Sequence, residues 1–189
     1  MAAIFINYRV GETAQIARLL YERLARIFGP GEVFFASENL LPGHRFDVPI
    51  LDAVRSSEVL LAVIGPHWQD APDASGSPRL HAEDDWVRRE ITEALALSIP
   101  VIPVLVDGAP SPHPDSLPPD LRPLPDLHHV RLGHRSGDPG VDVLAAAIRR
   151  TVPRLNTIPT SPPPTFTVHA PGSKGLQTGD GNTQHNTFT

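Results

Sequence analysis

The sequence predicts an α/β fold, a flavodoxin-like five-stranded parallel sheet with helices on both faces. Two observations predict it. Short apolar segments alternate with amphipathic segments of helical spacing over residues 3–150, an alternation typical of parallel strands joined by right-handed crossovers. The number of apolar segments also matches a small doubly wound sheet, for which the strand order 2-1-3-4-5 is the most economical.

The strands are predicted from short apolar runs rich in β-branched or aromatic residues. Their ranges are 3–8, 32–36, 58–65, 101–106 and 127–132. Pro103 lies inside the fourth range. Because proline cannot donate a backbone hydrogen bond, it favours an edge position or a bulge for this strand.

The helices are predicted where apolar residues recur every three or four positions. Their ranges are 13–28, 46–55, 84–97 and 141–150. Gly29-Pro30 ends the first of them. Ligands in such sheets bind beyond the carboxyl ends of the strands, so we expect the functional site next to Tyr8-Arg9, 37–45, 65–68 and Asp107-Gly108.

Composition excludes several classes of function. The net charge of -5 and the lack of a basic stripe argue against a nucleic-acid partner. The sequence has no cysteine, which excludes disulfides and thiolate metal sites and fits a reducing cytoplasm. No apolar run approaches the roughly 20 residues of a membrane helix, and the apolar start of the chain reads as a strand rather than a signal peptide. We therefore expect a cytoplasmic protein without a membrane partner.

The C-terminal part differs in composition from the rest. Residues 153–171 are rich in Pro, Thr and Ser, which is typical of an extended linker. Residues 172–189 are rich in Gly, Asn, Gln and Thr. The sequence thus predicts a domain over 1–152, a linker over 153–171 and a terminal motif over 172–189.

Glu90 is the most informative residue of the predicted helix over 84–97. On a wheel of about 100° per residue, one arc holds the apolar side chains of Trp86, Val87, Ile91, Ala94, Leu95 and Leu97. The opposite, solvated side holds Asp85, Arg88, Arg89, Thr92 and Glu93. Glu90 falls inside the apolar arc, one turn after Trp86.

A carboxylate on an apolar face is costly unless it is paired or lines a cavity. One interpretation is that Glu90 lies at the edge of the arc and pairs with an arginine such as Arg9. The other is that Glu90 lies at the rim of a pocket with Trp86 as an apolar wall. A carboxylate so placed can stabilise an oxocarbenium ion, as in glycoside chemistry.

Five short motifs occur in a characteristic order. They are IFINYR at 4–9, NLLPGHRF at 39–46, VIGPHW at 63–68 with Arg79-Leu80, DWVRREI at 85–91, and VIPVLV at 101–106. Together they resemble the bacterial branch of the TIR (Toll/interleukin-1 receptor) domain family over roughly residues 1–150. Asn7 stands where serine is commoner in that family, and 39–46 resembles its BB loop.

The resemblance implies an enzyme that cleaves NAD+, an NAD+ glycohydrolase, with NAD+ as its substrate and no cofactor or metal. Glu90 matches the catalytic glutamate of the enzymatic members, and Trp86 would border the nicotinamide ribose. Tyr8 and Arg9 would contact the ribose or phosphates. The BB loop, with Leu41, Gly43 and Phe46, would close over the dinucleotide and contact a neighbouring TIR domain in a homo-oligomer.

The terminal segment resembles the short amyloid signalling motifs of bacterial and fungal immune systems, which are related to the animal RHIM. The residues that carry the likeness are Leu176, Gln177, Gly179, Asn182, Gln184 and Asn186. Stacked Asn and Gln side chains can form ladders along a fibril. The resemblance implies activation by self-assembly, templated by a receptor with a matching motif. The alternative is a solvated, disordered tail.

Two other functions are compatible with the TIR resemblance: a non-catalytic signalling scaffold, and a synthase of a cyclic ADP-ribose-type messenger. The second would use the same glutamate. A response-regulator receiver shares the fold but needs a lysine at a strand end, and the only lysine is Lys174 in the tail. A role in innate immunity or antiphage defence follows from the resemblance alone.

Overall fold

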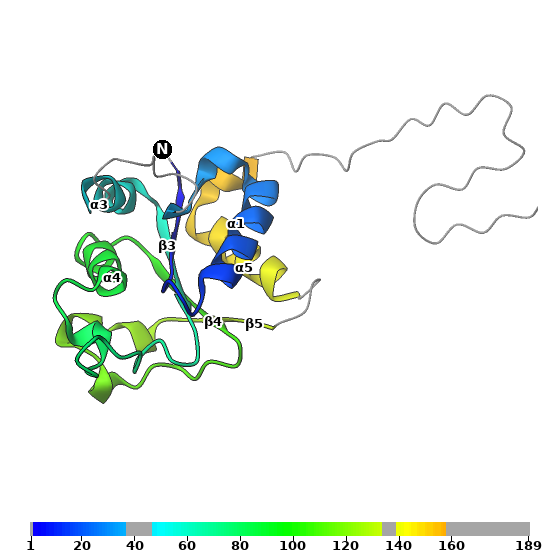
Figure 1. Ribbon diagram of the computed structural model, residues 1–189. Helices are drawn as coiled ribbons and strands as arrows, with labels where there is room; N and C mark the ends of the chain where they lie inside the picture. The colour runs from blue at the N-terminus through cyan, green and yellow to red at the C-terminus, as the bar shows by residue number, and fades with distance from the viewer. Residues whose placement is uncertain (1, 37–46, 134–138, 158–189) are drawn as a thin grey trace, which may run out of the picture.

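The computed structural model describes residues 2–36, 47–133 and 139–157, and a parallel β-sheet lies at its centre (Figure 1). The five strands are ordered β2-β1-β3-β4-β5, which confirms the predicted topology. Their bounds are β1 Ile4–Asn7, β2 Val33–Phe34, β3 Val59–Ile64, β4 Val101–Val106 and β5 Val130–Leu132. The three middle strands are buried along their whole length.

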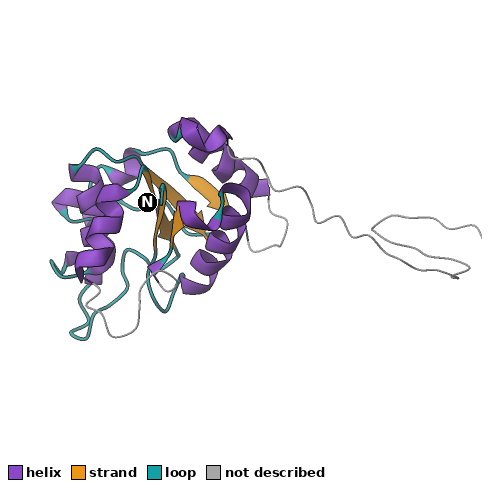
Figure 2. Ribbon diagram, turned by 90° about the horizontal axis from the view of Figure 1, so that it is seen from above, coloured by secondary structure: helices purple, strands orange, loops and turns teal. Residues whose placement is uncertain are grey.

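Helices cover both faces of the sheet (Figures 1 and 2). On one face lie α1 (Ala14–Phe28) and α5 (Pro139–Thr151), and on the other lie α3 (Asp47–Ser56) and α4 (Trp86–Ala96). The Pro-rich segment between β4 and β5 forms three short 3₁₀ turns, Pro114–Ser116, Pro119–Leu121 and Leu124–Asp126. No helix among these three described stretches is long and apolar enough to span a bilayer.

The sheet divides the core into two clusters, because successive strand residues point to opposite faces. In β1, Ile4 and Ile6 pack with α1 and α5. Phe5 packs with α3 and α4. The same alternation continues to Asn7, the polar residue at the end of β1, and directs it to the face that α4 covers.

Pro103 lies in an inner strand, so the predicted edge position is wrong. Leu60 donates its backbone N–H to the carbonyl of Pro100 at 2.9 Å. The backbone groups of Pro100, Ile102 and Val104 therefore point toward β3, and those of the residues between them point away from it. Pro103 therefore faces the β5 side, where pairing begins only at Val104. The missing N–H falls just before the paired stretch and removes no bond from it.

The packed part of the chain extends beyond α5. A 3₁₀ segment, Pro153–Thr157, follows the helix, and its Leu155 is fully buried in the cluster between α1 and α5. Arg154 bonds Glu32 at 2.8 Å and also Glu58, and these residues precede β2 and β3. The segment is thereby fixed against the edge of the sheet where the strands begin.

Candidate active site

The candidate site lies where the carboxyl end of β1 meets the first turns of α4. Asn7 is the last residue of β1 and, like Phe5 two positions earlier, it points to the face that α4 covers. Tyr8 points to the other face, where its ring lies 4.9 Å from that of Phe35. Glu90 lies on the buried side of α4, together with Val87, Ile91 and Ala94.

Glu90 is buried, with 8% of its surface exposed, and a side-chain amide binds it. Asn7 Nδ2 donates to Glu90 Oε2 at 2.7 Å and also to the carbonyl of Val87 at 3.2 Å. The wheel therefore placed Glu90 correctly. The partner is Asn7, a residue that sequence reasoning noted only as a departure from the commoner serine.

Burial raises the pKa of Glu90 to about 8, from 4.5 for the free side chain. The hydrogen bond from Asn7 opposes this rise in pKa, because it favours the ionised form. Asp85 raises the pKa further by like-charge repulsion, and Arg89 lowers it. A carboxyl with a pKa of about 8 is mostly neutral at pH 7 in the unliganded protein, and a nearby positive charge would favour its ionisation.

The alternative interpretation, in which Glu90 pairs with Arg9, is wrong. Arg9 is buried, and its guanidinium binds Asp85 through two hydrogen bonds, Nη1 to Oδ2 at 2.9 Å and Nη2 to Oδ1 at 3.3 Å. Asp85 is also the N-cap of α4, since its Oδ1 accepts from the backbone N–H of Arg88 at 3.0 Å. Asp85 is therefore buried, and its expected position on the solvated side was wrong as well.

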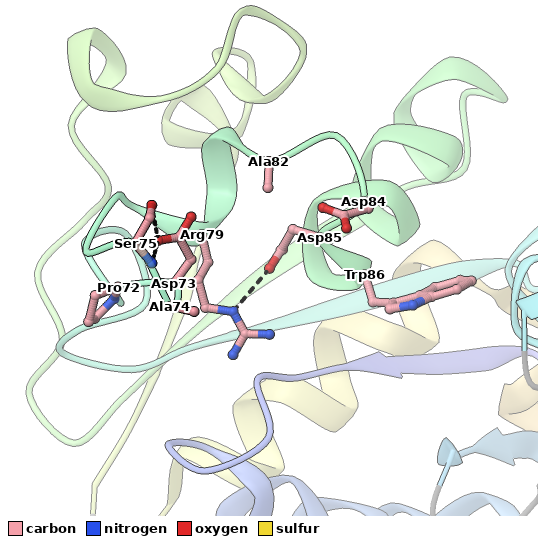
Figure 3. A pocket seen from close by; sticks show the side chains of 9 residues that line it. All are labelled: Pro72, Asp73, Ala74, Ser75, Arg79, Ala82, Asp84, Asp85 and Trp86. Atoms are coloured by element: carbon pink, nitrogen blue, oxygen red, sulfur yellow. Dashed lines mark hydrogen bonds and ion pairs between the residues drawn. The ribbon is translucent and has the colours of Figure 1, made fainter.

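A cavity of about 500 Å³ opens beside the N-terminus of α4. Its lining consists of Pro72, Asp73, Ala74, Ser75, Arg79, Ala82, Asp84, Asp85 and Trp86 (Figure 3). Figure 3 shows Arg79 and Asp85 pointing toward one another, and their charged groups lie 3.8 Å apart. Trp86 forms another part of the wall, and the Arg89 guanidinium lies 4.2 Å from the centre of its ring. Glu90 is not among the residues that line this cavity.

The other predicted site residues have different outcomes. Arg9 would have to share or leave Asp85 to contact a substrate, and Tyr8 points away from Glu90, so their predicted contacts with NAD+ stay predictions. Leu41, Gly43 and Phe46 of the BB loop lie outside the described residues. The same holds for the tail residues Leu176, Gln177, Gly179, Asn182, Gln184 and Asn186.

Glu12 is a second residue that sequence reasoning missed. It follows β1, and its Oε1 accepts from the backbone N–H of His67 at 2.6 Å, which joins the loops after β1 and β3. Gly65 permits this contact, because a Cβ there would lie 2.6 Å from Glu12 Oε1 and 2.9 Å from Thr13 Cγ2. Only the spatial proximity of the two strand ends could have suggested this bond.

A sequence profile described as the TIR domain matches residues 4–144. The chain belongs to the TIR domain family. The match covers all five strands and extends into α5. It confirms the family resemblance, and the flavodoxin-like sheet is the fold expected of a TIR domain.

Two curated relatives carry enzyme names. This TIR domain is 31% identical over 149 residues to "NAD(+) hydrolase sarm1" of Drosophila melanogaster, an alignment that covers 77% of this chain and 10% of that protein. It is 29% identical over 109 residues to "Probable 2' cyclic ADP-D-ribose synthase BdTIR" of Brachypodium distachyon, covering 57% of this chain and 42% of that protein. The chain thus spans about a tenth and about two fifths of the lengths of these relatives.

Two solved structures share the fold of this TIR domain. The TIR domains of the activated Roq1 resistosome, which recognises the pathogen effector XopQ, align with a TM-score of 0.53 at 14% identity, covering 78% of this chain and 99% of that one. A metazoan TIR-STING receptor from C. gigas in complex with 2',3'-cGAMP aligns with a TM-score of 0.50 at 23% identity, covering 78% of this chain and 39% of that one. At these identities the likeness concerns the fold.

Proposed function

We propose that this TIR domain cleaves NAD+ between nicotinamide and ribose and that Glu90 is its catalytic residue. The observation that carries the proposal is the environment of Glu90, a carboxyl group buried on the apolar side of α4 and bound by an amide rather than by a guanidinium. A merely structural carboxylate at such a depth is normally paired with a cation. The names of the two curated relatives, an NAD(+) hydrolase and a cyclic ADP-ribose synthase, support the same chemistry.

The proposed reaction breaks the bond between the nicotinamide nitrogen and C1′ of the ribose. The bonding electrons leave with nicotinamide, which becomes neutral, and the ribose becomes an oxocarbenium ion. Ionised Glu90 stabilises this cation electrostatically, an effect worth several kcal/mol in a site that excludes water. Water then attacks C1′ and gives ADP-ribose and a proton. Attack by a nucleophile within the same molecule would give a cyclic product instead.

We also propose that assembly controls this activity. In this proposal residues 172–189 form an amyloid-like motif at the end of a linker that follows the packed segment Pro153–Thr157, and a receptor with a matching motif nucleates the assembly. Clustering raises the effective concentration of the TIR domains, which then pair through Leu41, Gly43 and Phe46 of their BB loops. The protein would act as an effector of a bacterial immune or cell-death pathway.

The test is NAD+ consumption, with products identified by chromatography, at high concentration of the full-length protein. Glu90→Gln keeps the shape of the side chain and removes its charge, so nicotinamide release should fall by at least about 100-fold. Glu93→Gln is the matched control, because Glu93 lies on the same helix and pairs with Arg55 at 2.6 Å. This control should stay within about twofold of the wild type.

Three outcomes separate the candidate functions. ADP-ribose as the product supports a hydrolase, and a cyclic product supports a synthase of a messenger. A concentrated, assembled wild type that leaves NAD+ intact would contradict both enzymes and support the signalling scaffold.

A further inference from the structure

Asn7 joins β1 to α4 through both hydrogens of its side-chain amide. One goes to Glu90 Oε2 at 2.7 Å and the other to the carbonyl of Val87 at 3.2 Å, one turn earlier on the same helix. Asn7 has no exposed surface. With both donor positions used, neither the amide nor the Glu90 carboxyl can turn without losing a bond.

The amide is a costly choice for a purely structural residue at this point. Its Oδ1 is buried and has no hydrogen-bond partner among the described residues, and an unsatisfied buried acceptor destabilises a fold. An apolar residue would continue the pattern of Phe5 on this face of β1. What the amide adds is two donors directed at α4, one of them at the carboxyl group proposed to react.

We infer that Asn7 is a positioning residue for the proposed NAD+ cleavage: its two hydrogen bonds, to Glu90 Oε2 and to the carbonyl of Val87, hold the Glu90 carboxyl in one orientation. The inference rests on the proposed function. Asn7 acts through Glu90 and need not contact the substrate. A carboxylate that accepts a hydrogen bond is stabilised relative to the neutral acid. The bond that orients Glu90 therefore also increases the fraction of Glu90 that is ionised and can stabilise a cation.

The other charged groups near Glu90 do not replace Asn7. On α4, Asp85 and Arg89 act on Glu90 in opposite directions. Arg9, two residues after the end of β1, is bound to Asp85. Arg79 also lies against Asp85 at 3.8 Å, and Arg55 of α3 binds Glu93. Within 2–36, 47–133 and 139–157, the neutral amide of Asn7 is the group shown bonding Glu90 directly.

Two variants test the inference in the full-length chain. Asn7→Asp has nearly the same shape, but it loses the donor and places a second carboxylate beside Glu90. Asn7→Ser is smaller, fits without a clash and cannot bridge Val87 and Glu90 in the same way. Gln69→Leu is the matched control, because Gln69 also uses a side-chain amide to join two segments, bonding the backbone of His113 at 2.9 and 3.2 Å.

Two measurements are made on each variant. The first is the titration of the Glu90 carboxyl carbon by NMR with ¹³C-labelled glutamate, assigned by comparison with Glu90→Gln. The second is the dependence of kcat and KM on pH. In Asn7→Ser the pKa of Glu90 should rise by about one pH unit, which lowers kcat/KM at pH 7 about tenfold. Asn7→Asp should raise this pKa further, and Gln69→Leu should leave both quantities unchanged.

The outcomes separate this inference from the proposed function. An active wild type whose Glu90 pKa and pH profile are unchanged in Asn7→Ser and in Asn7→Asp would overturn the role of Asn7. An inactive wild type in which Asn7→Ser still raises the pKa of Glu90 would overturn the NAD+ cleavage and leave the contact of Asn7 with Glu90 established. If Asn7→Asp does not fold, Asn7→Ser decides by the same two measurements.

Discussion

Glu90 combines two properties that act against each other. Stabilising a cation requires an ionised carboxylate, whereas burial raises the pKa of Glu90 to about 8 and favours the neutral acid. Bound NAD+ can change this balance, because its nicotinamide ring carries a positive charge that favours the ionised form of a nearby carboxyl. Ionisation of Glu90 and binding of substrate are therefore expected to favour each other.

A pH profile should reveal this coupling. We expect kcat/KM to rise about tenfold per pH unit up to about pH 8 and to level off above it, because kcat/KM reports the pKa of the free enzyme. The rise in kcat should end at a lower pH, since bound NAD+ lowers the pKa of Glu90. Initial rates of nicotinamide release between about pH 5.5 and 9.5 measure both. A flat kcat/KM over this range would contradict a catalytic role for ionised Glu90.

The same pKa predicts a cost to stability. Because the pKa of Glu90 is raised in the folded state, its contribution to stability is complete below the unfolded value of 4.5 and is lost as the pH rises through about 8. Glu90→Gln has no such loss. Its free energy of unfolding should exceed that of the wild type increasingly from pH 5 to pH 8, by at most about 1.4 kcal/mol per pH unit.

Urea denaturation at several pH values measures this difference, and Glu93→Gln is again the control. Its stability relative to the wild type should change little with pH, because Glu93 is partly exposed and paired with Arg55. A constant difference between Glu90→Gln and the wild type from pH 5 to 8 would mean that the pKa of Glu90 is not raised.

At the residue scale the sequence located Glu90 but not its partner. A helical wheel shows which side of a helix a residue occupies, whereas Asn7 is 83 residues distant and belongs to another element. The alternation along β1 carried a usable signal, since Phe5 and Asn7 must point to the same face. That signal becomes specific only once the helix covering that face is known to be α4.

At the element scale, the buried pair of Arg9 and Asp85 joins the segment that follows β1 to the N-cap of α4. The wheel misplaced Asp85 because it treated the residue as helical, whereas Asp85 is the N-cap, with φ -65° and ψ 117°. Leu97 shows the same effect at the other end. It was expected in the apolar arc, but the helix ends at Ala96 and Leu97 is 50% exposed. Wheel positions fail at helix ends because the backbone there leaves the helical path.

Breaking this pair should be costly. Asp85→Ala leaves the guanidinium of Arg9 buried without its partner and removes the helix cap, so the free energy of unfolding should fall by about 3–5 kcal/mol. Replacing both residues, as in Arg9→Met with Asp85→Leu, should cost less than the sum of the two single changes. Urea denaturation at pH 7 measures all three variants.

The exposed pair of Arg55 and Glu93 provides the control for the buried pair. Arg55→Ala should lower the stability far less than Asp85→Ala does, because solvent screens an ion pair at the surface. Equal losses for Asp85→Ala and Arg55→Ala would contradict the importance assigned to burial.

At the scale of the whole molecule, the strand order could be predicted because parallel strands joined through helices allow few arrangements. The C-terminal end of the packed region was harder to predict. The change in composition drew attention to residue 153, yet Leu155 belongs to the core. A single leucine among prolines and polar residues has no periodicity to reveal its burial. Only the position of α5 against α1 does so.

The packed C-terminal segment also determines where the rest of the chain leaves the domain. Arg154 binds Glu32 and Glu58, which precede β2 and β3 and therefore mark the edge where the strands begin. Asn7 and Glu90 lie at the opposite edge, where β1 ends. The packed segment Pro153–Thr157 thus lies on the side of the sheet away from the candidate site.

Two truncations separate folding from assembly. A chain ending after Thr157 keeps Leu155, so its stability should equal that of the full-length protein. Its rate of NAD+ cleavage per molecule of enzyme should no longer increase with protein concentration. A chain ending after Arg154 lacks Leu155 and should lose about 2–5 kcal/mol of stability, which would mimic a loss of activation for an unrelated reason. Thermal unfolding and NAD+ consumption over a concentration series measure both chains. If the chain ending after Thr157 matches the full-length activity at every concentration, the tail does not activate the enzyme and assembly must depend on the TIR domain itself.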